Sequence, residues 1–444
     1  MLENYSKQVN KVLKNIKVGD RILLKRGKKS HEGFLMPKTD VGDPDSIVIK
    51  LDNGYNIGIR YEKGTKVEKL KKPSTKLSKE SFEKLEFNKS KPKVALISTG
   101  GTIASKVDYR TGGVYALESA EELLSNIPEL KDNIYIKDVS SPLKKMSEDM
   151  THDDWQKIAK EVAKHINNNK GVIITHGTDT MHYTSAALSF MLKDLHKPVV
   201  MVGSQRSSDR GSTDSFMNLI CAANVAIYDI GEVGICMHGT TDDHFCYFMR
   251  GTKVRKMHTS RRDAFRSINE LPLLRIFPEG KIDVLNKVYK KRDDSKEATA
   301  DVKFEDKVAL LKVYPSSDPQ ILEMLVKKKY KGFILEGTGL GHVPTFADKS
   351  WIPTIKKTVK DGIPIVIAPQ TIYGRINTRV YTNLRILYNE AKAIPVGDML
   401  PETAYVKLGW ILGHTKNIDK VREMMLTNIA GEISERSTVD SFLV

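Results

Sequence analysis

The sequence lacks several features that would place it in a membrane or outside the cell. Its 444 residues contain no apolar run of about 18 or more, which excludes a membrane-spanning helix. The opening stretch Met1–Tyr5 lacks the basic-then-apolar pattern of a secretory signal. Cysteine is rare, with only Cys221, Cys236 and Cys246, all in or near apolar stretches. We therefore expect reduced thiols and a cytoplasmic protein without membrane contact.

Metal-binding patterns are also missing. No Cys-x-x-Cys pair and no His/Cys spacing typical of a metal site occurs, so we expect neither a metal nor a cofactor in this chain. Aromatic residues make up only 7% of the sequence, and few of them lie among the lysines. Any nucleic-acid contact would therefore be electrostatic rather than based on stacking.

Positive charge is abundant and unevenly distributed. The formal net charge is +16, and residues 1–91 hold 22 Lys and Arg against 12 Asp and Glu. A basic segment beside a nearly balanced body indicates an anionic partner, with nucleic acid as the first candidate. A solvated, lysine-rich surface, as in proteins adapted to heat, explains the same composition.

The first 70 residues read as a small antiparallel module. Helical spacing of apolar residues predicts a short helix within residues 1–16. Short strand-like runs separated by turn residues follow, at Arg21–Leu24, Gly33–Met36, Ser46–Leu51 and Tyr55–Ile59. Residues 1–70 are therefore predicted to form a small β-barrel or sheet that serves for docking. Residues 71–92, rich in Lys, Ser, Glu and Pro, are predicted to be a charged linker.

From residue 93 onward, apolar runs alternate with helical patterns. The predicted strands are Gly171–Thr175, Pro198–Val202, Val233–Met237, Val308–Val313, Gly332–Leu335 and Pro364–Ala368. The predicted helices are Thr180–Leu192 and one that Thr151 opens as N-cap, with Asp154 three residues on. Such alternation predicts an α/β fold with a helix-covered parallel sheet. Because the pattern restarts near residue 305, we expect two lobes, a larger one at 93–305 and a smaller one at 306–444.

One stretch combines a buried strand with an exposed hydroxyl. Residues 94–98 are apolar or small, and they lead directly into Gly100-Gly101 and then Thr102. The carboxyl end of a strand is where open α/β sheets place their ligands. A hydroxyl on such a bare turn is a candidate nucleophile, although an ordinary strand-to-loop turn explains the same residues.

A second hydroxyl-rich loop occupies the equivalent position after another strand. His176-Gly-Thr-Asp-Thr180 follows the predicted strand Gly171–Thr175, so the two loops can face one crevice. Asp179 can orient a base for a hydroxyl. The base itself is not evident from these residues. A lysine of lowered pKa would serve, but composition alone cannot choose one among 71 basic residues.

These two loops resemble a known family. Thr99-Gly-Gly-Thr-Ile-Ala104 and Thr175-His-Gly-Thr-Asp-Thr-Met181 look like the paired signatures of bacterial-type L-asparaginases. The segment Arg250–His258, followed by Asp263-Ala-Phe265, is similar to the one that supplies the family's catalytic lysine. The resemblance identifies that lysine as Lys256 and implies an asparaginase-like, two-lobed body.

The whole layout is closer to one branch of that family. A small β module, a charged linker and an asparaginase-like body resemble the glutaminase components, known as D subunits, of archaeal glutamyl-tRNA(Gln) amidotransferases. The resemblance implies a tRNA-binding partner, the E subunit, which uses ATP and Mg²⁺ to convert Glu-tRNA(Gln) to Gln-tRNA(Gln). It further implies glutamine as the small-molecule substrate and a homodimer within a heterotetramer.

The resemblance also implies roles for single residues. Thr102 would attack the side-chain amide of glutamine and form an acyl-enzyme. Thr178, Asp179 and Lys256 would form the relay that moves protons. Ser147 would bind the amino-acid end of the substrate.

Ser147 shares that task with its neighbour. Ser147 and Glu148 would hold the α-carboxylate and α-amino groups, with Asp179 sharing the amino group. Many free asparaginases have Gln where this chain has Glu148, and a carboxylate keeps the ability to bind an ammonium group.

Two further elements follow from the resemblance. Backbone N–H groups near Gly101 and Gly177 would stabilise the oxyanion. The stretch Ser105–Tyr115 resembles the family's lid, for which Tyr115 is our candidate tyrosine and Tyr109 the competitor.

Two alternatives remain open at the level of sequence. A free-standing asparaginase or glutaminase would share the body but has no need of the basic module. A binding protein that has lost activity would share the fold but has no need of Thr102, Thr178, Asp179 and Lys256 together.

Overall fold

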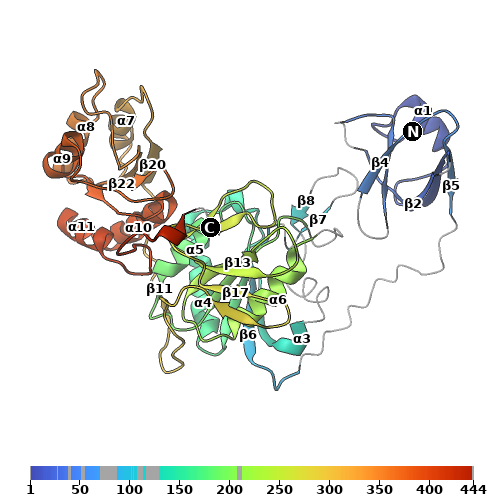
Figure 1. The fold of residues 1–444 in the computed structure, drawn as a ribbon, viewed down its shortest axis with the longest axis horizontal. Helices are drawn as coiled ribbons and strands as arrows, with labels where there is room; N and C mark the ends of the chain where they lie inside the picture. The colour runs from blue at the N-terminus through green and yellow to red at the C-terminus, as the bar shows by residue number, and fades with distance from the viewer. Residues whose placement is uncertain are drawn as a thin grey trace.

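The molecule consists of an N-terminal sheet, a large central lobe and a C-terminal lobe (Figure 1). The computed structural model describes residues 2–27, 29–38, 42–51, 56–70, 88–101, 103, 105–107, 114–116, 130–207 and 213–442. None of the helices within these residues is long and apolar enough to cross a membrane.

The N-terminal module is an antiparallel sheet with one short helix. Its strands are β1 (Arg21–Arg26), β2 (Lys29–Leu35), β3 (Ser46–Lys50), β4 (Asn56–Arg60) and β5 (Lys66–Lys69). They pair in the order β4-β3-β2-β1-β5, and α1 (Lys7–Val12) precedes them. Tyr5, Val9 and Leu13 are buried against Ile22 and Ile47. The helix and its flanking apolar residues thus cover one face of a sheet whose strands alternate buried and more exposed side chains.

Eight of the described strands form the sheet of the central lobe, in the order β18-β17-β14-β13-β12-β10-β6-β9. Five of them, from β13 to β9, are parallel, and these are β13 (Val233–His238), β12 (Val199–Val202), β10 (Gly171–Thr175), β6 (Lys93–Ser98) and β9 (Tyr135–Ser140). The antiparallel strands are β14 (Cys246–Arg250), β17 (Leu274–Ile276) and β18 (Ile282–Val284). The expected parallel sheet is thus mixed, because the connection between β13 and β14 is too short for a crossover.

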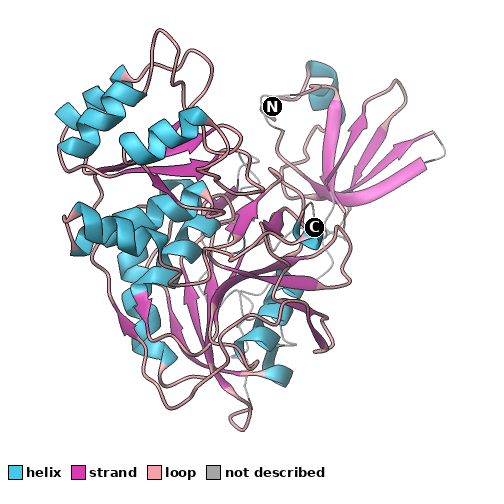
Figure 2. Ribbon diagram, turned by 60° about the vertical axis from the view of Figure 1, so that its left-hand side comes forward, coloured by secondary structure: helices cyan, strands magenta, loops and turns pink. Residues whose placement is uncertain are grey.

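Helices cover both faces of this sheet (Figure 2). They are α3 (Leu130–Asn133), α4 (His152–Ile166), α5 (Met181–Met191) and α6 (Ser215–Ala226). Helix α4 begins with the expected capping box of Thr151 and Asp154. Its apolar stripe, which includes Trp155, Ile158 and Val162, is buried in the core with residues of β6 and β10. The central strands β6, β10, β12 and β13 are therefore almost entirely buried, and β6 and β10 end level with each other.

Small elements complete the central lobe. Two short strand pairs are β7 (Ser105–Val107) with β8 (Val114–Ala116), and β15 (Val254–Lys256) with β16 (Phe265–Ser267). A third pair joins β11 (Leu192–Lys193) to β19 (Thr299–Ala300). The 3₁₀ turns are η2 (Ser147–Asp149) and η4 (Val439–Ser441).

The C-terminal lobe is a smaller α/β unit. Its parallel strands are β20 (Val308–Lys312), β21 (Gly332–Gly337), β22 (Ile365–Pro369) and β23 (Ile394–Pro395). Its helices are α7 (Gln320–Lys327), α8 (Ile352–Lys360), α9 (Thr382–Arg385), the π-helical turn η3 (Ile386–Glu390), α10 (Pro401–His414) and α11 (Ile418–Leu426). Helix α10 packs against both β21 of this lobe and α5 of the central lobe.

Buried ion pairs stabilise the seam between the two lobes and the end of the chain. Lys253 Nζ lies 2.6 Å from Asp398 Oδ2, and both side chains are buried. Lys407 Nζ lies 2.5 Å from Glu432 Oε1, again with no exposure of either side chain. Separating such partners strands a charge in a medium of low polarity, so these contacts resist relative motion.

Candidate active site

Two loops meet where β6 and β10 end. The strands pair in parallel, with Thr175 opposite Ser98, so the loops that follow start level. Thr99 donates both its backbone N–H and its hydroxyl to the carbonyl oxygen of Thr175, at 3.1 and 2.9 Å. The loop that leads to Thr102 is thereby tied to the loop that carries Thr178.

The loops touch backbone to backbone at two glycines. Gly101 has a φ of +82°, and a Cβ placed on it would lie 2.2 Å from the backbone nitrogen of Gly177. Gly100 has a φ of +103°, and a Cβ there would lie 2.4 Å from the carbonyl oxygen of Lys145. Only glycine satisfies both the positive φ and the close approach at these positions.

A third segment, residues 145–147, crosses the two loops. Lys145 accepts the N–H of Gly101 at its carbonyl oxygen and donates its own N–H to the carbonyl oxygen of Thr99, both at 3.1 Å. Two residues on, the Ser147 hydroxyl accepts the backbone N–H of Asp179 at 3.1 Å. We call residues 145–147 the strap, because they bond to both loops.

The strap is anchored by an ion pair with α4. Lys145 Nζ donates to Asp154 Oδ2 at 2.7 Å, and the Asp154 side chain is only 1% exposed. The same carboxylate accepts hydrogen bonds from the N–H and hydroxyl of Thr151. Burial alone raises the pKa of Asp154, but the bonds from Lys145 and Thr151 outweigh it and hold that pKa below its ordinary value. The carboxylate is therefore charged and fixes the strap.

Lys256 reaches the second loop from the hairpin of β15 and β16. Its Nζ donates to Thr178 Oγ1 at 2.9 Å and to Asp179 Oδ1 at 2.6 Å. The Lys256 side chain is 10% exposed, while the Asp179 side chain is 62% exposed. An amine, a hydroxyl and a carboxylate thus form one contiguous polar group with access to solvent, an arrangement that can pass a proton to and from a bound substrate.

Two buried histidines lie behind this group and stay neutral. Burial lowers the pKa of His176 to about 4, although its bond to the Gly177 carbonyl oxygen opposes the shift. Burial, with the charges of Arg255 and Lys256, lowers the pKa of His182 to about 3. His176 joins Nδ1 to the Gly177 carbonyl at 2.7 Å and Nε2 to the Thr184 hydroxyl at 3.0 Å, so it supports the second loop rather than serving as a base.

The predicted site residues differ in how far the structure describes them. Thr178, Asp179 and Lys256 lie in direct contact, and Ser147 lies beside them. Thr102, the predicted nucleophile, lies outside the described residues. On either side of Thr102, the structure describes Gly101 and the buried Ile103.

Glu148, Gly101 and the two candidate lid tyrosines stand as follows. Glu148 follows Ser147 in η2 and is exposed. Gly101 uses its N–H on the Lys145 carbonyl, so an oxyanion role for that group would require this bond to be given up. Tyr115 pairs with Lys106 in the β7–β8 hairpin, where its side chain is outside the described residues, as Tyr109 is entirely.

Sequence reasoning missed the supporting residues. The capping pair Thr151 and Asp154 was visible, but nothing in the sequence links Asp154 to Lys145. His176 directly follows a strand, and that position is a signal for a buried side chain that holds the turn. Within the part of the chain that is described, no group of three or more His, Cys, Asp or Glu side chains could hold a metal ion.

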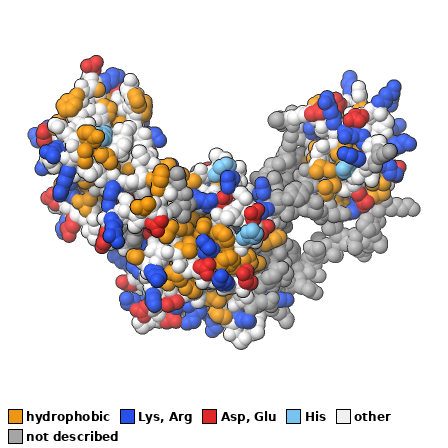
Figure 3. All heavy atoms as spheres, in the orientation of Figure 1, with side chains coloured by type: hydrophobic (Ala, Val, Ile, Leu, Met, Phe, Trp, Pro, Cys, Tyr) orange, Lys and Arg blue, Asp and Glu red, His pale blue; other side chains and the backbone are white. Residues whose placement is uncertain are grey.

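A second surface feature lies on the N-terminal module, where Lys and Arg mix with Asp and Glu (Figure 3). The basic residues of its strands are mostly paired, for instance Lys25 with Glu68 at 3.2 Å and Arg26 with Glu62 at 3.0 Å. By contrast, four exposed lysines in and just after α1 have no acidic partner among the described residues, and these are Lys7, Lys11, Lys14 and Lys17. Lys29, Lys63 and Lys66, elsewhere in the module, are also exposed without an acidic partner among the described residues, so four of the unpaired lysines lie in and just after α1 and three lie outside it.

Comparison with known protein families divides the chain in the same way. Residues 93–290 match the family model "Asparaginase, N-terminal", and residues 307–425 match the "Glutaminase/Asparaginase C-terminal domain". Residues 16–70 match the "GatD N-terminal domain". The body is thus asparaginase-like, and the N-terminal sheet has a family of its own.

Full-length relatives decide the family. The chain is 49% identical over 435 residues to the D subunit of glutamyl-tRNA(Gln) amidotransferase from Pyrococcus abyssi, covering 97% of this chain and 98% of that one. It is 50% identical to the D subunit from Thermococcus kodakarensis over 433 residues, or 96% of each chain. The chain belongs to the family of glutamyl-tRNA(Gln) amidotransferase D subunits. It is therefore part of an enzyme, and the D subunit from Methanopyrus kandleri is a further relative at 43% identity over all of this chain and 97% of its own.

Solved structures agree with the fold of this D-subunit chain. The thermostable L-asparaginase from Thermococcus kodakarensis aligns with a TM-score of 0.69 and 30% identity, covering 78% of this chain and 100% of the asparaginase. L-asparaginase I from Vibrio cholerae aligns with a TM-score of 0.67 and 28% identity, over 78% of this chain and 99% of its own. The α/β body expected from the sequence is confirmed.

Proposed function

We propose that this chain is the glutaminase component of a tRNA-dependent amidotransferase. The observation that carries the proposal is the contact of Lys256 Nζ with Thr178 Oγ1 and Asp179 Oδ1, at 2.9 and 2.6 Å, beside the Gly100-Gly101 turn. A nucleophilic hydroxyl, a proton relay and a carboxylate are the parts that amide hydrolysis through an acyl-enzyme requires.

In the first step, the Thr102 oxygen attacks the side-chain carbonyl carbon of glutamine. The hydroxyl proton passes to the relay of Thr178 and Lys256, and the carbonyl π electrons move to the oxygen. Collapse of this intermediate breaks the C–N bond, and the relay returns the proton to the departing nitrogen, which leaves as ammonia. Each well-placed donor to the oxyanion contributes about 3 kcal/mol to this step.

In the second step, water attacks the acyl-enzyme carbonyl. The relay takes a proton from the water. The C–O bond to Thr102 then breaks, and the Thr102 oxygen receives that proton from the relay. Glutamate leaves, and Thr102 is restored. Asp179 stabilises the positive charge on Lys256 while the relay holds the proton, which their 2.6 Å separation supports.

Ser147 and Glu148 hold the amino-acid end of glutamine in this proposal. The Ser147 hydroxyl already accepts the Asp179 N–H, and its own proton is available for a substrate carboxylate. Glu148 is exposed next to it, and with Asp179 it presents negative charge to an α-ammonium group. The strap and Glu148 directly after it are thereby the recognition element for the substrate's α groups.

The ammonia is delivered to a tRNA-binding partner, the E subunit, which uses ATP and Mg²⁺ to amidate Glu-tRNA(Gln). The names of the relatives and the match of residues 16–70 to the GatD N-terminal domain support this partner. The unpaired lysines in and just after α1 suit an anionic surface of the assembly. We infer a homodimer within a heterotetramer that works in the cytosol, in keeping with three buried free thiols.

The test compares Thr102→Ala with Thr259→Ala in the assembled complex. Thr259 is exposed in the turn after β15 and is the control. We expect Thr102→Ala to abolish glutamine-dependent amidation of Glu-tRNA(Gln) and to leave ammonia-dependent amidation intact, because only the ammonia source is lost. Loss of both activities would give Thr102 a wider role than the one proposed.

A free-standing asparaginase or glutaminase is the alternative, since L-asparaginases share the body of the chain. The measurement is ammonia release from glutamine and from asparagine, with and without the partner and Glu-tRNA(Gln). Release that depends on the partner and the tRNA supports the amidotransferase function. Strong release by the lone chain would support the alternative, and no release under any condition would indicate a binding protein.

A further inference from the structure

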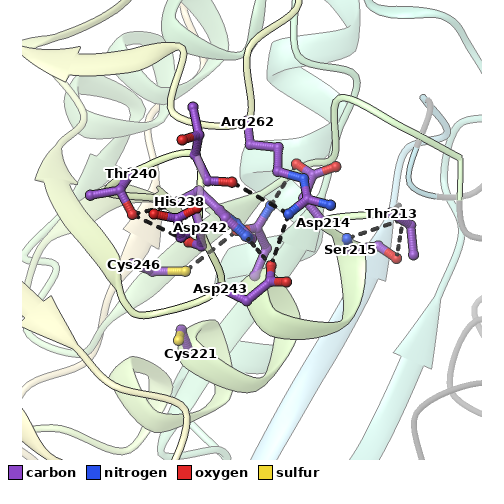
Figure 4. Close-up of polar contacts among 12 residues, drawn as sticks. Thr213, Asp214, Ser215, Cys221, His238, Thr240, Asp242, Asp243, Cys246 and Arg262 are labelled. Carbon is purple, nitrogen blue, oxygen red and sulfur yellow. Dashed lines mark hydrogen bonds and ion pairs between the residues drawn. The ribbon is translucent and has the colours of Figure 1, made fainter. Parts of the chain in front are cut away.

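A buried imidazole lies between two acceptors at the end of β13. His238 is fully buried, with Nδ1 2.6 Å from Asn218 Oδ1 and Nε2 3.0 Å from Asp243 Oδ1. Asp243 also accepts from Arg262 Nη1 at 3.1 Å. Figure 4 shows His238 and Asp243 in this group, with Arg262 reaching Asp243 from above.

The orientation of the Asn218 amide is set by its other partners. Its Nδ2 donates to the carbonyl oxygen of Gly203 at 3.0 Å and to Asp214 Oδ2 at 3.2 Å, and both of these are acceptors. Oδ1 is therefore the atom that faces His238, and Cys246 Sγ also donates to it at 3.4 Å. The Nδ1 of His238 must accordingly carry a proton.

The other ring nitrogen faces a carboxylate that is charged. Burial alone raises the pKa of Asp243, but the hydrogen bond from His238 and the charge of Arg262 outweigh it and lower that pKa. A charged carboxylate only accepts, so Nε2 must also carry a proton. The geometry thus calls for an imidazolium ion, with its positive charge held between Asp243 and the amide of Asn218.

On one side, this ion is joined to the hairpin that carries Lys256. Asp243 lies in the loop between β13 and β14, and Arg262 lies in the turn between β15 and β16. Arg266 of β16 also donates to the carbonyl oxygen of Gly239 in the same loop, at 3.4 Å. The loop that His238 holds through Asp243 is thus the support of the lysine hairpin.

On the other side, the ion is joined to the backbone beneath Thr178. Asn218 binds the carbonyl oxygen of Gly203, which directly follows β12. A Cβ on Gly203 would lie 2.8 Å from the Thr178 methyl carbon, so this glycine packs against Thr178. His238 therefore lies between the loop that supports the Lys256 hairpin and the backbone that packs against Thr178. The Lys256 Nζ and Thr178 Oγ1 atoms lie 2.9 Å apart.

We propose that His238 is a positioning residue whose imidazolium, bonded to Asp243 and Asn218, holds Lys256 in register with Thr178. The proposal rests on the proposed glutaminase function for its effect on rate, but its protonation and its mechanical role do not depend on that function. His238 touches neither Lys256 nor the substrate loops directly, and it acts through Asp243 and Arg262 on one side and through Asn218 on the other.

The charge on the ring depends on the groups that face it. From α6 these are Asn218, with Asp214 behind it, and from β14 the thiol of Cys246. Burial raises the pKa of Cys246, so the thiol stays neutral, and the charged groups on the Nε2 side of the ring are Asp243 and its partner Arg262. Without the Nε2 proton, two acceptors would face each other and the hairpin would lose its support.

The first test reads the protonation state. Nitrogen-15 spectra of the histidine-labelled complex at neutral pH, assigned with His238→Gln, should show His238 protonated on both nitrogens. In Asp243→Asn, the amide can donate to Nε2, so the ring should become neutral with its proton on Nδ1. A wild-type ring with one unprotonated nitrogen would overturn the proposal.

The second test reads the mechanical role, with Asp242→Asn as the matched control. Asp242 is exposed on the same loop, and its carboxylate has no ion pair within the described chain. In Asp243→Asn, we expect faster hydrogen–deuterium exchange in peptides covering residues 254–267, and unchanged exchange in Asp242→Asn. Equal exchange in both variants would overturn the positioning role, whether or not the protein is a glutaminase.

The third test reads the rate in the assembled complex. Asp243→Asn should lower kcat for ammonia release from glutamine about tenfold with little change in KM, because alignment rather than binding is lost. An inactive wild-type complex would refute the proposed function alone, while a kcat equal to that of Asp242→Asn would refute the positioning role.

Discussion

Gly101→Ala tests the contact between the two loops most directly. A Cβ at Gly101 would lie 2.2 Å from the nitrogen of Gly177, whereas ordinary contact begins at 3.4 Å. The loops would therefore have to separate by about 1 Å, a displacement that costs about 100-fold in rate when reacting groups must align. That loss corresponds to about 2.7 kcal/mol in the activation free energy. The φ of +82° adds about 1–2 kcal/mol of backbone strain in the folded state.

The assay compares Gly101→Ala with Gly280→Ala. Gly280 has a φ of +98° but no atom within 4 Å of the added Cβ, so it carries the backbone strain without the clash. Both variants should unfold at a lower temperature, and only Gly101→Ala should release ammonia from glutamine about 100-fold more slowly. Amidation by the complex from free ammonia should be normal in both.

One result would refute this reasoning. If Gly101→Ala kept the glutaminase rate of Gly280→Ala, the close approach of Gly101 to Gly177 would have no part in aligning the site. The rate would then depend on side chains alone, and the two loops would be free to move apart without effect.

Two further substitutions test the supports of the site and of the fold. Lys145→Met should raise KM for glutamine, measured against Lys144→Met, because the strap loses its anchor. The loss of unfolding free energy in Lys145→Met should be full at neutral pH. It should shrink as pH falls from 3.8, the ordinary pKa of an aspartate, through the lower pKa that Asp154 has in the folded wild type beside Lys145. Lys407→Met should lower the free energy of unfolding in urea by about 3–5 kcal/mol, since Glu432 stays buried without its partner.

Much of the fold could be predicted because its strands are apolar runs. Gly171–Thr175 is buried at every position, and such runs between helical stripes indicate a covered parallel sheet. The strand Lys66–Lys69 was not predicted, because Val67 is its one apolar residue and supplies no alternating pattern. The three-residue strand Leu274–Ile276 is likewise too short to carry a period.

The candidate site, too, could be predicted only in part from the sequence. The loops after β6 and β10 could be placed together from strand order, but their partner Lys256 lies 77 residues from Asp179. Composition cannot select one lysine at that distance, so Lys256 came from the resemblance alone. Lys145 acts through its backbone, which bonds to both Gly101 and Thr99, and through its side chain, which pairs with Asp154. No residue pattern in the sequence indicates these contacts. Thr102 stays a prediction, as do the roles of the other site residues.

The ion pair between Lys253 and Asp398 has a consequence for how the two lobes communicate. Lys253 stands three residues before Lys256 on the same short segment, and the carbonyl oxygen of Thr252 beside it accepts the hydroxyl of Thr403 from α10. A swing of the C-terminal lobe would therefore drag the backbone of Lys256 along with it. A protein bound to the C-terminal lobe would thus be able to shift the Lys256 amine without contacting the two site loops.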